Sequence, residues 1–182
     1  MCFRTICFKP ITKTLMLISV SLFCVFSETV AQRGIDYTLY ANIIYRFTKY
    51  INWPNEKKTG DFVLGIIGDS PLYNELKAFV GNKTVGAQKI VVKKIPSSAS
   101  SYDCQMLFIC EDESKSIKRI AALTEDAPVL IVSESDGLAR KGSCINFIVV
   151  DEHLRLEINK TNIEQRNLSV ASDLLSLGII VK

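Results

Sequence analysis

The chain has 182 residues, and 48% of them are hydrophobic, which is enough to form the core of one domain. It carries 22 Lys and Arg residues against 19 Asp and Glu residues, a formal net charge of +3 at pH 7. Much of this excess lies before residue 32, so the remainder is nearly balanced, and no Lys/Arg cluster there points to nucleic acid as a partner.

The N-terminal segment has the layout of a secretory signal peptide. Its basic residues are Arg4, Lys9 and Lys13. An uncharged, mostly apolar run follows from Leu15 to Phe26, and Ala31 supplies a small residue at the end of a cleavage site. We therefore expect a signal peptide over 1–31 and one exported domain over 32–182. The apolar run is short for a membrane span, so no stable insertion is expected after cleavage; an uncleaved anchor is the alternative.

The stretch from Tyr37 to Pro54 predicts a helix with one buried face. It holds four of the six tyrosines and the only tryptophan, Trp53. Apolar side chains recur at helical spacing: Leu39, Tyr40, Ile43, Ile44, Phe47, Tyr50 and Ile51. Asp36 can cap its start, and Pro54 stops it, because the residue before a proline disfavours the helical conformation. We interpret it as a core-packing helix. The alternative is a ligand or partner face, with Tyr37 and Tyr45 pointing outward.

Strands and helices alternate in the next part of the chain. The apolar run over 61–69 predicts a buried strand, and Ser70 begins a helix that ends at Gly81. Further elements are predicted as strands over 89–96, 105–110 and 128–133 and as a helix that Ser114 opens. Such alternation is typical of a largely parallel sheet covered by helices on both faces.

The C-terminal part departs from this alternation. Strands over 143–150 and 153–159 flank the short link Asp151-Glu152 and predict an antiparallel hairpin. A closing helix is predicted over 161–177, and 179–181 can add an edge strand. The predicted fold class is therefore α/β: a single domain with a mixed, mostly parallel sheet flanked by helices, with a C-terminal hairpin and a closing helix.

Three cysteines remain after the predicted leader, namely Cys104, Cys110 and Cys144. Cys104 and Cys110 flank one predicted strand, which places them about 20 Å apart and beyond the reach of a disulfide. A bridge within the chain would join Cys144 to Cys104 or to Cys110 and leave one thiol unpaired. Three buried free thiols are the alternative.

The sequence lacks the usual motifs of catalysis and metal binding. Its one histidine, His153, falls at the predicted hairpin turn, where an exposed side chain is expected. It has no zinc-ligand spacing, nucleophile elbow, P-loop or dinucleotide fingerprint. The acidic run Glu111-Asp112-Glu113 is interpreted as solvated charge near a helix start. We therefore predict no catalytic residue, no metal, no cofactor and no enzymatic activity.

Two loops after predicted strands are candidates for ligand binding. One contains Gly68, Asp69 and Ser70, and the other runs from Ser133 to Gly137 and contains Asp136. In a mostly parallel sheet, ligands bind at the carboxyl ends of strands. Backbone N–H groups at the helix start after Ser70 can hold a small anion. Ordinary turn and capping chemistry is the alternative for both loops.

The order and spacing of these pieces resemble the YfiR family of periplasmic proteins over nearly the whole mature chain. The matching pieces are Ala41, Phe47, Tyr50 and Trp53-Pro54 of the opening helix, the turn 65–71, the stretch 129–137, the hairpin 147–159, and Leu168, Ser169, Ser172, Leu174, Leu175 and Leu177 near the end.

This resemblance implies a regulator. The best-known member of the family represses a membrane-bound diguanylate cyclase by binding its periplasmic part, which lowers cyclic-di-GMP and biofilm formation; a homodimer and disulfide tuning are also implied. Other membrane sensors can take the place of the cyclase. A second hypothesis is a small-ligand-binding protein that feeds a membrane sensor kinase through the loops at Asp69 and Asp136. A third is an enzyme with an unrecognised site.

Overall fold

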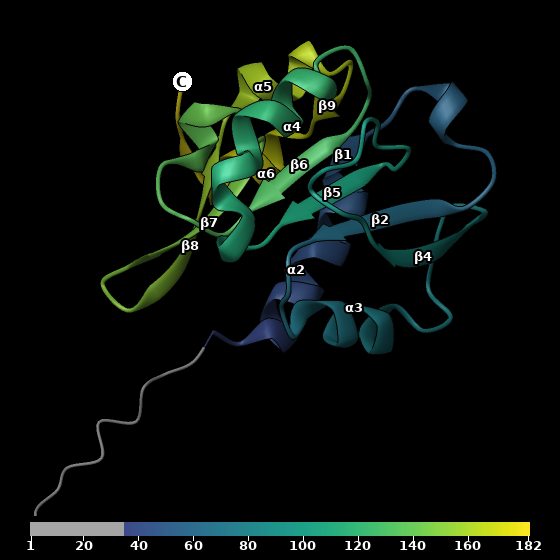
Figure 1. The fold of residues 1–182 in the computed structure, drawn as a ribbon, viewed down its shortest axis with the longest axis horizontal. Helices are drawn as coiled ribbons and strands as arrows, with labels where there is room; N and C mark the ends of the chain where they lie inside the picture. The colour runs from purple at the N-terminus through teal and green to yellow at the C-terminus, as the bar shows by residue number, and fades with distance from the viewer. Residues whose placement is uncertain (1–34) are drawn as a thin grey trace, which may run out of the picture. The chain divides into compact units, whose positions relative to one another are not determined.

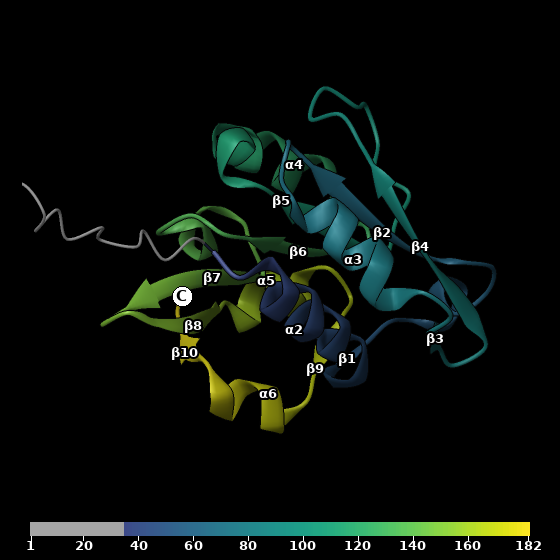
Figure 2. The same ribbon diagram turned by 90° about the horizontal axis from the view of Figure 1, so that it is seen from below.

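An eight-stranded mixed sheet forms the centre of the structure, in the order β10-β8-β7-β6-β5-β2-β4-β3 (Figure 1; the edge strands β3 and β10 are labelled in Figure 2). It is seen in a computed structural model that describes residues 35–182, so the predicted signal peptide lies outside the described residues. The strands are β2 Phe62–Ile67, β3 Thr84–Val85, β4 Gln88–Lys94, β5 Met106–Ile109, β6 Leu130–Ser133, β7 Ile145–Val150, β8 His153–Ile158 and β10 Ile179–Ile180. Strands β2, β4, β5, β6 and β7 are mutually parallel, which confirms the predicted mostly parallel sheet.

Helices cover the two faces of this sheet. The α-helices are α2 Tyr37–Tyr50, α3 Leu72–Val80, α4 Ile117–Leu123, α5 Lys160–Gln165 and α6 Ser172–Leu177. The 3-10 helices are η1 Asn55–Lys57, η2 Glu111–Ser116 and η3 Leu138–Lys141. Helices α2 and α3 lie side by side on one face, and α4 lies on the other (Figure 2). Within residues 35–182, none of these helices combines the length and apolar character needed to cross a membrane.

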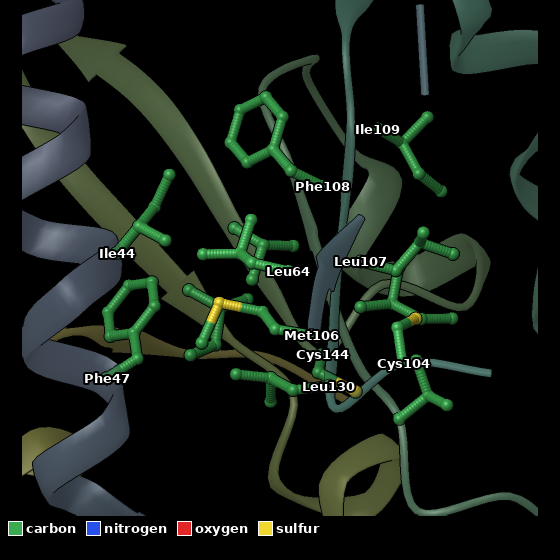
Figure 3. Packing of buried hydrophobic residues seen from close by; sticks show 14 of the residues in the cluster. Ile44, Phe47, Leu64, Cys104, Met106, Leu107, Phe108, Ile109, Leu130 and Cys144 are labelled. Atoms are coloured by element: carbon green, nitrogen blue, oxygen red, sulfur yellow. The ribbon is translucent and has the colours of Figure 1, made fainter. Parts of the chain in front are cut away.

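The hydrophobic core lies between the sheet and α2. Ile44 and Phe47 of α2 face Met106 and Phe108 of β5, whereas Leu107 points to the opposite face (Figure 3). All five side chains are at most 1% exposed. The central strands are buried on both faces, which explains why their sequences are continuously apolar rather than alternating.

The opening helix begins as predicted and ends earlier. The Oδ1 atom of Asp36 accepts a hydrogen bond from the Leu39 N–H at 3.1 Å, so Asp36 is the N-cap. The helix stops at Tyr50 rather than at Pro54, because Ile51 and Asn52 form the short strand β1, which pairs with β9 (Ser169–Val170).

Burial on α2 agrees with a core-packing helix. Tyr40 is 5% exposed and stacks on Phe147 of β7, with ring centroids 4.3 Å apart. Leu39, expected on the buried face, is 44% exposed. Tyr37 and Tyr45 are half-buried, and Tyr45 packs edge-on against Phe79 of α3.

The predicted hairpin is present. Strands β7 and β8 pair in register from Ile145 opposite Ile158 to Val150 opposite His153. Asp151 and Glu152 have φ angles of 50° and 61°, the left-handed conformation that a two-residue type I′ turn requires at both positions.

The prediction of one closing helix over 161–177 is wrong. The segment forms α5 and α6 with strand β9 between them. Asn167, with a φ of 54°, turns the chain after α5, and Leu168 then enters the core at 3% exposure. Pairing of Val170 with Ile51 fixes the following residues as a strand. The predicted helix at Ser114 also differs, because 111–116 form η2 and α4 begins only at Ile117.

Candidate functional site

The direction of strand addition reverses between β2 and β5. After β2 the chain adds β4 on one side, and it then crosses over to add β5, β6 and β7 on the other. In open sheets of this kind, ligands bind beside the carboxyl ends of the strands at such a switch point. Asp69 follows β2, Glu111 and Asp112 follow β5, and Glu134 follows β6. The topology therefore gathers four carboxylates at one edge.

These side chains line a hollow of about 330 Å³, which we call the acidic hollow. Its lining residues are Tyr37, Asp69, Ser70, Cys110, Glu111, Asp112 and Glu134. The structure thus brings the predicted ligand-binding residues Asp69 and Ser70 together with an acidic run that the sequence suggested was only solvated charge.

The Asp112 carboxylate occupies the switch point itself. Its Oδ2 atom accepts a hydrogen bond from the Asp69 N–H at 3.0 Å. Gly68, with a φ of 102°, lets it approach, because a Cβ atom on Gly68 would lie 2.3 Å from Asp112 Oδ1 and 2.8 Å from Cys110 Cβ. Asp112 therefore takes a backbone donor that a bound anion would otherwise use.

Other polar groups of this loop also have partners within the protein. Asp69 Oδ1 forms an ion pair with Lys94 Nζ at 3.0 Å, and Ser70 Oγ accepts a hydrogen bond from the Leu72 N–H at 3.2 Å. Ser70 therefore bonds to the first turn as a cap does, although α3 itself begins at Leu72 and Pro71 occupies its N-cap position. Ligand binding by Gly68, Asp69 and Ser70 stays a prediction.

Glu134 is a partly buried carboxyl group at this edge whose two oxygens have different surroundings. Its Oε1 atom accepts a hydrogen bond from the Glu111 N–H at 3.2 Å, while its Oε2 atom is buried without a hydrogen-bond partner. Burial raises the pKa of Glu134 from 4.5 to about 7; the negative charges of Glu111 and Asp112 raise it further, and the Glu111 N–H opposes the rise. Its charge can therefore change near neutral pH.

Among the described residues, the thiols of Cys104, Cys110 and Cys144 are buried and free. Burial, with smaller contributions from Glu134 and Asp112, raises the pKa of Cys110 to about 12, and burial likewise raises that of Cys104 to about 12. Cys144 is fully buried, and burial raises its pKa too. Because the thiolate is the reactive form, these positions favour unreactive thiols. A bridge from Cys144 to either of the others stays a prediction.

The second predicted loop belongs to a different hollow. Asp136 is exposed and lines a hollow of about 390 Å³, which we call the basic hollow. Its lining residues are Ser114, Lys115, Ile117, Lys118, Ser135, Asp136, Leu138 and Lys141. Gly137 has a φ of 72° and precedes η3. Asp136 therefore lies in a different hollow from Asp69, although Glu134 of the same predicted loop lines the acidic hollow together with Asp69.

His153 lines neither the acidic hollow nor the basic hollow. It is exposed at the hairpin turn, and its Nδ1 atom contacts the backbone carbonyl of Asp151. Among residues 35–182, no group of three or more His, Cys, Asp or Glu side chains is placed to hold a metal ion.

Sequence reasoning placed Glu134 within a candidate loop without naming it as a site residue, and it missed the lysines of the basic hollow. Glu134 directly follows the buried strand β6, which was a usable signal for a residue at the carboxyl edge. Lys115 and Lys118 look like the solvated side of a helix, and their closeness to Lys141 appears only in three dimensions.

The fold and its carboxyl edge define an α/β protein of the doubly wound type, with a mixed sheet that ends in an antiparallel hairpin. The profile of the YfiR/HmsC-like family matches residues 37–179, from the start of α2 to β10. The chain therefore belongs to the YfiR/HmsC-like family, which confirms the resemblance noted from its sequence. No curated protein matches the chain.

Proposed function

We propose that this protein is a periplasmic regulator that binds the periplasmic part of a membrane-bound diguanylate cyclase and lowers cyclic-di-GMP, and with it biofilm formation. The observation that carries the proposal is the family match over residues 37–179. The leader-like segment 1–31 supports export, and a domain without an evident catalytic set among residues 35–182 suits a protein that acts through contact.

An apolar groove supports action through protein contact. It has a volume of about 240 Å³ and lies between α2, β8 and α6. The apolar side chains that line it are Ile43, Phe47, Tyr50, Leu154, Leu156, Leu174 and Leu177. Leu177 is 66% exposed, and the neighbouring edge strand β10 exposes Ile179 and Ile180 by 47% and 49%. An apolar groove with exposed apolar side chains on neighbouring elements is typical of an interaction surface.

The test is to delete and restore the gene and to measure cyclic-di-GMP and biofilm. We expect deletion to raise both and the full-length chain to restore them. Leu177→Asp should fail to restore them, because a central apolar contact typically contributes about 2 kcal/mol or more to binding, equivalent to about thirtyfold in affinity. Leu123→Asp is the matched control, since Leu123 is 44% exposed on α4.

Two results would overturn the proposal. One is an unchanged cyclic-di-GMP level on deletion and on restoration. The other is the recovery of no membrane cyclase or sensor after crosslinking of the envelope with the functional chain. Fractionation and N-terminal sequencing of the same strain check the proposed periplasmic location and cleavage after Ala31. Light scattering of the purified protein checks the proposed homodimer.

A periplasmic small-ligand-binding protein that feeds a membrane sensor kinase is the second candidate. The observation that favours it is the pair of hollows at the carboxyl edge of the parallel strands. A thermal-shift screen separates the candidates, because a ligand at a hundred times its dissociation constant stabilises a protein by about 2.7 kcal/mol. The absence of any shift across metabolite classes would count against this candidate and leave the regulator proposal standing.

A further inference from the structure

The basic hollow collects positive charge from separate elements. Lys115 comes from η2, Lys118 from α4 and Lys141 from η3, and all three are exposed. None of them belongs to an ion pair found within residues 35–182. Those pairs are Lys57–Asp103, Lys94–Asp69, Arg140–Glu157 and Lys160–Glu164. Three ammonium groups that share one concave surface without a paired carboxylate produce a positive potential that favours an anion.

The hollow also contains a hydrogen-bonding group without a partner. Ser135 lines it, and the Ser135 Oγ atom is buried and makes no hydrogen bond. Leaving a buried hydroxyl unsatisfied costs about 1–3 kcal/mol, and a hydroxyl can donate to an anion oxygen. Ile117 and Leu138 are 2% and 4% exposed, so packing in the core holds the wall that carries the lysines.

The neighbouring hollow has the opposite charge. Glu134 lines the acidic hollow, whereas the next residue, Ser135, lines the basic one. Carboxylates therefore repel anions from the switch point, where this kind of sheet commonly binds them, and the lysines attract them to the adjacent edge. The volume of about 390 Å³ lies within the range of small-molecule sites.

We propose that the basic hollow is a binding site for a phosphate group, held by the ammonium groups of Lys115, Lys118 and Lys141 with Ser135 Oγ as a hydrogen-bond donor. The phosphate belongs to a small molecule or to a phospholipid headgroup, and both present the same oxygens to the site. Among the described residues, Asp136 is the only carboxylate that lines the hollow, and its charge opposes binding. The inference goes beyond the proposed regulation and does not depend on it.

The test is an NMR titration of the full-length protein with inorganic phosphate at constant ionic strength. We expect saturable shifts at Ser135 and Lys118. The variant Lys118→Gln/Lys141→Gln should weaken binding about three- to tenfold, whereas Asp136→Asn should tighten it about twofold or more. Lys89→Gln/Lys93→Gln is the control, because it removes the same charge from exposed positions on β4.

A second arm uses vesicles of phosphatidylglycerol and of phosphatidylcholine. If the wild-type protein binds the anionic vesicles and Lys118→Gln/Lys141→Gln does not, the result supports the site and identifies a lipid headgroup as the source of the phosphate. If the protein binds free phosphate but not the vesicles, the result supports the site and identifies a small molecule as the source. The inference is overturned if neither probe binds, if the shifts map elsewhere, or if Lys89→Gln/Lys93→Gln weakens binding as much as the variant in the hollow.

Discussion

Replacement of Glu134 by Gln should remove a pH-dependent loss of stability. The folded state raises the pKa of Glu134 from 4.5 to about 7, chiefly through burial. The folded protein therefore binds the carboxyl proton of Glu134 more tightly than the unfolded chain does. Such a carboxyl stabilises the fold fully below pH 4.5, and the stabilisation is lost as the pH rises through 7. The free energy of unfolding of the wild-type protein should therefore include a contribution from Glu134 that decreases between about pH 4.5 and pH 7.

The magnitude follows from the size of the pKa change. At about 1.36 kcal/mol per pKa unit, the full change corresponds to at most about 3.4 kcal/mol. Glu134 is only partly buried and water screens its charge, so we expect about 1–2 kcal/mol between pH 5 and pH 8. Glu134→Gln keeps an oxygen that can accept from the Glu111 N–H and carries no charge at any of these pH values.

Urea unfolding at several pH values measures this term. Fluorescence of Trp53 is a suitable probe, because it is the only tryptophan and is 4% exposed. Relative to wild type, Glu134→Gln should gain stability at pH 8 and gain little at pH 5. Glu125→Gln removes an exposed carboxylate from another place and should leave the difference between the two pH values unchanged. A Glu134→Gln curve parallel to that of wild type would refute the reasoning.

Two further predictions concern the same edge and the thiols. Gly68→Ala should destabilise the fold by about 2–4 kcal/mol in urea unfolding, because the cost of the left-handed φ and the cost of the overlap with Asp112 add. Gly60→Ala is the control: Gly60 is also left-handed but has open space around its Cβ position, so this variant should lose only about 1–2 kcal/mol. Equal losses in the two variants would contradict the overlap. In the chain that begins at Gln32, we expect Cys104, Cys110 and Cys144 to resist Ellman's reagent at pH 8 when native and all three to react after unfolding; a single reactive thiol in denaturant would instead demonstrate a bridge.

The sheet was predictable because its signals are local. The runs that form β2, β5 and β6 are continuously apolar, and turn or capping residues such as Ser70 and Gly81 mark the ends of the elements between them. Each segment therefore favours its structure independently of the rest of the chain. Under this condition, hydrophobic periodicity and turn residues predict secondary structure correctly.

The break in the closing helix was not predictable on the same grounds. Residues 161–177 have apolar positions that can be fitted to one helix, yet Val170 pairs with Ile51, which lies more than a hundred residues earlier. Tertiary pairing therefore overrides a weak local preference. The candidate sites show the same limit: the loops at Asp69 and Asp136 were found from their places after strands, but their separation into two hollows depends on the paths of η2 and η3.

The junction between the hollows leads to one more prediction. Glu134 and Ser135 are adjacent at the end of β6 but line hollows of opposite charge, so ionisation of Glu134 adds a negative charge close to the proposed anion site. Below pH 7 this carboxyl is neutral in the folded state, and anion binding should strengthen.

Sulfate is the probe for this coupling, because its own charge does not change between pH 5 and 8. At moderate salt, one added charge on the residue next to Ser135 should alter the affinity for sulfate by about two- to threefold. We therefore expect wild-type protein to bind sulfate more tightly at pH 6 than at pH 8, and Glu134→Gln to lose most of that difference. If both proteins show the same pH dependence, the lysines or the wider charge distribution account for it, and the two hollows act independently.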